Sequence, residues 1–168
     1  YSGHAVSLSS DGSVVAIGAY GNDGNGNKSG HVRLFQNDFV APTVSGVTST
    51  TANGSYKVGD VITISVAFSE SVTVNTAGGT PTLELETGST DRTASYASGT
   101  GTSTLVFSYT VQAGDTSSDL DYKATSSFAL NGGTIQDAAG NNATLTLASP
   151  GASNSLGANK ALVIDGVA

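Results

Sequence analysis

The sequence of 168 residues contains no cysteine, no methionine and no tryptophan. Without cysteine the chain forms no disulfide, and it offers no thiolate for metal binding or for nucleophilic catalysis. Charged residues are scarce at 11% of the chain, and only three residues are proline. This composition is unusual for a cytosolic enzyme, and a chain of this length has room for one main core with a small appendage.

Basic residues are especially few, since six Lys and Arg stand against 13 Asp and Glu, for a net charge of −7. Nucleic-acid binding requires a basic surface that follows the phosphates, so we expect no nucleic-acid partner. An acidic surface suits divalent cations better. No apolar run approaches the length of a membrane span and no leader opens the chain at Tyr1, so we expect a mature piece or fragment that does not insert into a membrane.

Helix signals are almost missing, whereas Thr, Val, Ser and Gly favour strands and turns, so the sequence predicts an all-β chain. Strong alternation of apolar and polar residues marks residues 61–68 and 105–111 as strands with one wet face. Shorter alternating runs lie at 82–86, 145–147 and 162–164. Turn-forming clusters such as Asn131-Gly132-Gly133 separate these runs, and the spacing predicts an immunoglobulin-like β-sandwich or a barrel.

The composition changes between residues 36 and 42, which predicts a boundary between segment 1–37 and a β-sandwich domain of 38–168. In the first segment, residues 4–8, 13–17 and 31–35 are expected to form a three-stranded β-meander with a turn at Asp11-Gly12. About forty residues cannot bury such strands on their own.

The sequence SLSSDGSVVAIGA of residues 7–19, followed by SGHVRLF of residues 29–35, resembles an FG-GAP repeat, one blade of an integrin-like β-propeller. The match covers one incomplete blade. Because a propeller needs several blades around an axis, the resemblance does not imply a complete propeller in this chain.

Residues from Ala41 onward resemble the bacterial Ig-like repeats of very large secreted adhesins. The likeness rests on YKVGD at 56–60, FSESV at 68–72, TLEL at 82–85 and IQDAAGN at 135–141. It implies a secreted, extracellular or cell-surface protein with a structural or adhesive role. An internal echo of DFVA at 38–41 in DGVA at 165–168 suggests one unit of a tandem array, with neighbouring repeats as partners.

Calcium takes several oxygen ligands, so acids clustered in Gly-rich loops are the relevant signal, and the resemblance also implies calcium. One cluster lies in the sequence GDTSSDLD, where positions 119 and 121 face the same way in an extended chain. A second combines Asp137 with Asn141, and a third is Glu70 with the junction acids, near a domain end. The predicted metal ligands are therefore Glu70, Asp115, Asp119, Asp121, Asp137, Asp38 and Asp165.

For any single one of these residues the simpler interpretation is a turn, because Asp and Asn side chains hydrogen-bond their own backbone. The loop GNDGNGN at 21–27 resembles the calcium loop of propeller blades, but Asn replaces most of its acids. Asp23, Asn25 and Asn27 are weaker candidate ligands, and we favour a flexible loop there.

Enzyme chemistry finds little support, so we expect a non-catalytic protein. Only His4 and His31 could act as bases at neutral pH, and no G-x-S-x-G motif directs attention to a nucleophile. Glu84 and Glu86 share one strand face as a glycosidase pair would, but solvated acids on an outer face are the preferred interpretation.

Three functions remain open. The first is a calcium-stabilised spacer in a tandem array, and the second is a subunit of an extracellular filament assembled head-to-tail by N-terminal strand donation. The third is a module that binds a surface glycan or protein. Glycan binders display exposed aromatic rings, whereas Tyr96, Phe107 and Tyr109 occupy core or sheet positions, which favours the spacer.

Overall fold

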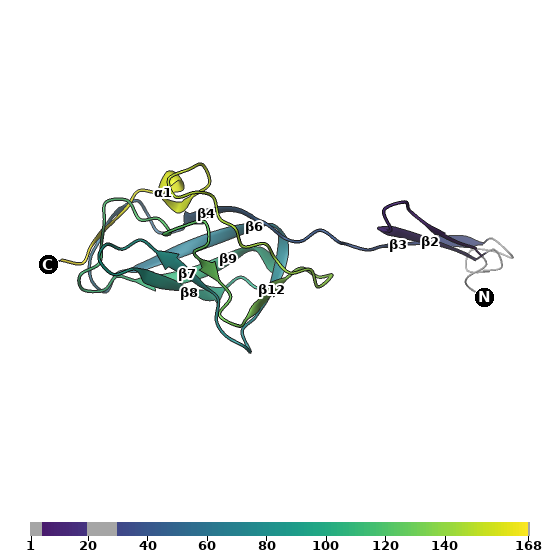
Figure 1. Ribbon diagram of the computed structural model, residues 1–168, viewed down its shortest axis with the longest axis horizontal. Helices are drawn as coiled ribbons and strands as arrows, with labels where there is room; N and C mark the ends of the chain where they lie inside the picture. Colours follow the sequence, from purple (N-terminus) through teal and green to yellow (C-terminus); the bar gives the residue numbers. More distant parts are fainter. Residues whose placement is uncertain (1–4, 20–29, 168) are drawn as a thin grey trace. The chain divides into compact units, whose positions relative to one another are not determined.

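The computed structural model in Figure 1 describes residues 5–19 and 30–167, and the chain divides into two compact units. Unit 1 is Tyr1–Val40 and unit 2 is Ala41–Ala168. This division falls three residues after the boundary expected from composition. No helix in the described part of the chain has the length and apolar character needed to cross a membrane.

Unit 1 contains one antiparallel sheet of three strands in the order β1-β2-β3, as the sequence predicted. The turn between the first two strands is held by Asp11, whose Oδ1 accepts hydrogen bonds from Ser9 Oγ at 2.6 Å and Ser13 N at 3.1 Å. Gly12 follows with a φ of 75°, which only glycine adopts at little cost. The strands are β1 (Ala5–Leu8), β2 (Val14–Ala19) and β3 (His31–Gln36).

Unit 2 is built on a strongly curled sheet of seven strands. Its strands run in the order β11-β7-β8-β9-β6-β12, and β4 pairs with the first part of β6 while β12 pairs with the last. The long central strand therefore connects both ends of the unit. The strands are β4 (Val44–Ser49), β6 (Val61–Asn75), β7 (Thr82–Leu85), β8 (Arg92–Ser98), β9 (Thr102–Thr110), β11 (Phe128–Ala129) and β12 (Thr134–Gln136).

A small mixed sheet and a single helical turn complete unit 2. The sheet has the order β10-β13-β5, with β13 parallel to β5 and antiparallel to β10. The helix lies beside β4 (Figure 1), where Asn159 Nδ2 donates to Val47 O at 2.8 Å. These elements are β5 (Gly54–Tyr56), β10 (Thr116–Ser117), α1 (Leu156–Asn159) and β13 (Leu162–Asp165).

One hydrophobic core holds unit 2 together, and the alternation in the sequence predicted its main wall. Burial of each large aliphatic or aromatic side chain contributes about 1.5–3 kcal/mol. Loops after β9 supply the opposite side of the core through Leu120, Tyr122 and Leu147. The wall is formed by Ile62, Ile64, Val66 and Phe68 of β6, Leu83 and Leu85 of β7, and Leu105, Phe107 and Tyr109 of β9.

The all-β prediction is confirmed, but the strand expected at 145–147 is wrong. That segment has no strand, and only isolated bridges at Asn142 and Thr144 precede it. Leu147 is nevertheless buried, and its N–H donates to Thr125 O of an irregular loop at 2.9 Å. Alternating leucines thus reflect core contacts here without a ladder of strand hydrogen bonds.

Candidate functional site

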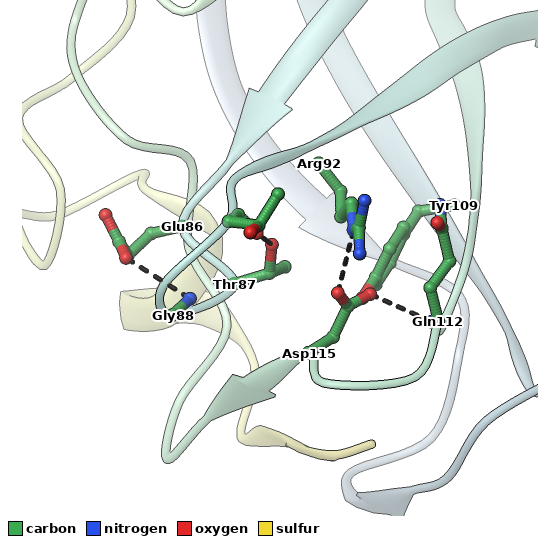
Figure 2. A network of polar contacts seen from close by, with 8 residues as sticks. Glu86, Thr87, Gly88, Arg92, Tyr109, Gln112 and Asp115 are labelled. Atoms are coloured by element: carbon green, nitrogen blue, oxygen red, sulfur yellow. Dashed lines mark hydrogen bonds and ion pairs between the residues drawn. The ribbon is translucent and has the colours of Figure 1, made fainter. Parts of the chain in front are cut away.

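The most elaborate polar site of unit 2 surrounds Asp115, in the turn that follows β9. The turn closes with a hydrogen bond from Asp115 N to Gln112 O at 3.2 Å, and Gly114 adopts a φ of 89°. This geometry directs the Asp115 side chain inward, where it is only 1% exposed (Figure 2). A buried carboxylate without partners would be very unfavourable, so its contacts decide what the site does.

Both oxygens of the Asp115 carboxylate are engaged. Oδ1 accepts from Arg92 Nε of β8 at 2.8 Å, an ion pair whose arginine side chain is 26% exposed. Oδ2 accepts from the hydroxyl of Tyr109 of β9 at 2.6 Å and from Gln112 N at 2.8 Å. Figure 2 shows these three donors converging on the carboxylate. Asp115 therefore joins two neighbouring strands to the turn that leaves them.

The contacts set the ionisation of the pair. Burial alone would raise the pKa of Asp115, but hydrogen bonds from Tyr109, Arg92 and Gln112 outweigh burial and hold that pKa below its usual value. Burial and the adjacent carboxylate raise the pKa of the Tyr109 hydroxyl above its ordinary value. At neutral pH the site consequently contains a carboxylate that accepts and a phenol that donates.

The same turn fastens the C-terminal strand of unit 2. Gly166 N donates to Asp115 O at 2.7 Å, and Gly114 N donates to Gly166 O at 2.9 Å. A Cβ atom at Gly166 would lie 2.8 Å from Asp115 O, so only glycine fits against the turn. Thr116 continues the contact by pairing with Asp165. The turn that carries the buried Asp115 and the C-terminal residues 165–166 thus hold each other in place.

A hairpin beside the site closes it on the other side (Figure 2). Thr87 is fully buried, and its Oγ1 donates to Thr90 O at 2.8 Å. Its carbonyl accepts from Thr116 N at 2.9 Å. Glu86 accepts a long hydrogen bond from Gly88 N at 3.4 Å and is exposed. The hairpin contacts the turn after Asp115 mainly through backbone groups.

The acids predicted as a calcium cluster at 115–121 are not brought together. Asp119 is exposed, and Asp121 is buried with one oxygen accepting from Tyr122 N and the other from Gly151 N, each at 2.9 Å. Within the described residues these two carboxylates and Asp115 do not converge within 4.8 Å. The two buried acids instead satisfy backbone or side-chain donors of their own unit.

Two other predicted ligands of unit 2 do lie close together, because carboxylate oxygens of Glu70 and Asp137 are within 4.8 Å of each other. Glu70 is half-buried on β6, next to Ser69, whose N–H donates to Thr43 O at 2.9 Å. The pair therefore lies at the end of unit 2 where the chain enters it. This arrangement places two negative charges at that end.

Asp137 also organises its own loop. Its Oδ1 accepts from Asn141 N at 2.8 Å and its Oδ2 from Asn141 Nδ2 at 2.7 Å. Burial would raise the pKa of Asp137, but hydrogen bonds from Asn141, Ala139 and Gly140 lower it below the usual value. The Asp137 carboxylate thus holds its own loop while one of its oxygens lies within 4.8 Å of a Glu70 oxygen.

Two further predicted ligands are each described within their own unit. Asp165 is exposed at the end of β13, and Asp38 belongs to unit 1, where its Oδ1 accepts from Val40 N at 2.9 Å. The loop residues Asp23, Asn25 and Asn27 lie outside the described residues.

The acids considered for glycosidase chemistry have other contacts. Glu84 lies 3.6 Å from Lys123 Nζ, and that ammonium lies 2.6 Å from Asp91 Oδ2. Glu86 points into its hairpin. Of the two histidines, His31 is half-buried on β3 and His4 lies outside the described residues. Glu84 is thus part of a partly exposed charge cluster with Lys123 and Asp91.

Sequence reasoning did not find the Arg92–Tyr109–Asp115 network. Tyr109 sits at an inward position of an alternating strand, where it reads as core, and Arg92 precedes Asp115 by 23 residues. The signal that existed was a single arginine at the start of a strand in a chain with very few basic residues.

Comparisons with protein families, with curated proteins and with solved structures found no match to this chain. The geometry of the site is therefore the basis for assigning a function. Its buried carboxylates are satisfied by donors of the same unit, which holds loops and strands in place.

Proposed function

We propose that the chain is a non-catalytic structural or adhesive module of an extracellular bacterial surface protein, in which unit 2 is an immunoglobulin-like spacer of a tandem array. The observation that carries the proposal is the position of the two ends of unit 2. Figure 1 shows the chain entering unit 2 at one end and the C-terminus leaving at the other. A spacer requires ends in these positions, because its neighbours then extend the array.

The length of strand β6 gives the distance between the two ends of unit 2. Thr43 is bonded to Ser69 of β6, whereas the chain exit at Gly166 is bonded to the turn after β9. That turn lies beside the start of β6, since Val111 N donates to Asp60 O at 3.0 Å. From residue 61 to residue 69 a strand rises about 26 Å at roughly 3.3 Å per residue. In a tandem array the module would therefore separate its neighbours by roughly that length of strand.

Both ends are also fastened to the main sheet. At the first end, Thr144 N donates to Pro42 O at 2.7 Å and Thr43 exchanges hydrogen bonds with Ser69. At the second end, the buried Asp115 connects the exit turn to β8 and β9. A module under tension in an array needs this anchorage, which supports the spacer over a freely hinged domain.

We further propose that calcium stabilises the module at the end containing Glu70 and Asp137. Carboxylate oxygens are preferred calcium ligands, and two lie within 4.8 Å there. Asp115 fits a metal poorly, because the positive charge of Arg92 already pairs with its carboxylate. The junction acids Asp38 and Asp165 remain sequence-based candidates for further ligands.

Thermal unfolding followed by circular dichroism, with the protein in chelator and then in calcium, tests this proposal. At calcium about a hundredfold above its Kd, selective binding to the folded state raises the melting temperature by about 10 °C. The double variant Glu70→Gln with Asp137→Asn should lose most of this rise. The control Glu86→Gln, which removes an exposed acid of the same unit, should keep it. An unchanged melting temperature in the unaltered chain would leave a spacer without calcium.

The filament subunit is the second candidate, and one observation favours it. In the described residues β1 and β3 pair only with β2, so their outer edges have free backbone donors and acceptors. Strand donation to another subunit would satisfy them. Electron microscopy of the chain before and after deletion of residues 1–36 tests this, since fibres that persist in the deletion variant contradict it.

No comparable observation favours glycan binding. The described Phe and Tyr residues of unit 2 are all buried or half-buried, including Tyr96, Phe107 and Tyr109. Such rings are unavailable for stacking on a sugar.

A further inference from the structure

Large apolar side chains lie on both faces of the sheet of unit 1. Residues directly opposite in an antiparallel sheet share a face, so the register places Leu8, Val15 and Phe35 together on one face, which we call face A. Ala16 and Leu34 lie together on the other, face B, as do Val32 and Ala5. A sheet with one solvated face would alternate apolar and polar residues, and this sheet does not.

Large side chains on both faces are open to solvent. On face A the exposed fractions are 68% for Val6, 62% for Leu8 and 49% for Phe35. On face B they are 67% for Val32 and 71% for Leu34. Isolated exposed apolar residues are common on proteins, but contiguous ones on two faces of one small sheet mark a surface for association.

Size and charge indicate what covers these faces. Three strands of four to six residues present roughly 300 Å² per face, below the ~800 Å² per partner of a stable interface. Each contact is consequently weak, and both faces are needed. Unit 1 has three Asp against Lys28 and Arg33, a net charge of −1, so unit 2 carries −6 of the −7. Two copies therefore repel each other least at unit 1.

We propose that unit 1 is a self-association element, in which the β1–β3 sheet of one chain stacks face to face on the same sheet of another copy. Most side chains on the two faces are apolar, and Arg33 on face A is the one charged residue of the three strands, so each face can stack on the same face of a copy with little loss of charge solvation. Stacking on both faces continues beyond a dimer, as open assemblies do. This goes beyond the spacer function and requires neither calcium nor strand donation.

Sedimentation velocity of the full chain in chelator, over a range of concentrations, tests the proposal. The expected result is a weight-average mass that rises with concentration beyond a dimer, and that rises further with salt, which screens the repulsion between acidic units. Leu8→Lys on face A and Leu34→Lys on face B should each limit assemblies to dimers or less, and the double variant should be monomeric. Val61→Lys, at an exposed position of unit 2, should assemble as the unaltered chain does.

A chain that stays monomeric at every concentration would overturn the proposal, and so would association that survives the double lysine variant. Because lysine could unfold a small sheet, a second measurement uses cysteine, which the chain lacks. Single variants Leu8→Cys and Leu34→Cys should form intermolecular disulfides at least tenfold faster than Val61→Cys under mild oxidant. Equal rates at the three positions would contradict stacking. Neither result bears on calcium binding by unit 2, so this proposal and the spacer function fail separately.

Discussion

At the scale of single residues, the buried Asp115 carboxylate is tightly held, because it accepts hydrogen bonds from Arg92, Tyr109 and Gln112. We predict that Asp115→Asn lowers the free energy of unfolding by about 2–4 kcal/mol, since it removes the negative charge that pairs with Arg92. Urea denaturation measures this. Asp119→Asn is the matched control, and as an exposed substitution it should change stability by less than about 0.5 kcal/mol. Equal effects of the two variants would contradict the role of the network.

Asp115, together with Asp137, affects how the free energy of unfolding depends on pH. The pKa values of Asp115 and Asp137 are lowered in the folded state, so on acidification the unfolded chain takes up protons before the folded chain does. The stability they contribute is present above their unfolded pKa near 3.8 and is lost as pH falls through their lower folded pKa. Urea midpoints between pH 7 and pH 2 should fall steeply below pH 4. In Asp115→Asn that fall should be shallower, and an identical profile would refute this assignment.

These residues also show which roles of acidic side chains could not be predicted from the sequence. Asp115 was expected to bind a metal, because an acid in a Gly-rich loop has the same local sequence whether it meets calcium or an arginine. Its partners lie on β8 and β9, and only the pairing of those strands brings them to the turn. Glu70 and Asp137, in contrast, were both predicted as ligands and do lie close. Acids in similar local sequences therefore differ in role because of their contacts with distant segments of the chain.

At the scale of elements, strands were predictable where they alternate. Residues 61–68 and 105–111 have a period of two, and their inward residues are buried on β6 and β9. The pairing order was not predictable, because alternation defines a face without defining a neighbour. Leu145 and Leu147 illustrate the converse, since they alternate and contact the core from an irregular segment.

Two loops cross so closely that only glycine fits, which yields a prediction for the elements they connect. A Cβ atom at Gly79 would overlap the carbonyl oxygen of Asn131, and Gly79 has a φ of 157°. Gly79→Ala should therefore destabilise unit 2 by more than 2 kcal/mol, because the loop after β6 must move away from the loop before β12. Gly101→Ala is the control, with a φ of 81° and open space around it, and should cost about 1 kcal/mol. Thermal unfolding distinguishes a steric effect from one of backbone conformation alone.

At the scale of the whole molecule, the two units differ in how many of their large apolar side chains are buried. Every member of the hydrophobic core belongs to unit 2, from Val47 to Ile164. The described residues of unit 1 form a sheet of three short strands that leaves most of its large apolar side chains exposed. This division agrees with a spacer that folds alone and an appendage that associates.

The division predicts that residues 41–168, produced without unit 1, unfold cooperatively with the same urea midpoint as the full chain. The physical reason is that removal of unit 1 takes away no core side chain, and an array of spacers requires each module to fold without its neighbour. Equilibrium unfolding of both proteins in chelator, at a concentration low enough to prevent association, provides the comparison. A midpoint lowered by the truncation would mean that unit 2 depends on unit 1 for stability. The module could not then be repeated independently along an array, and the filament subunit, whose N-terminal segment is integral to assembly, would become the better explanation.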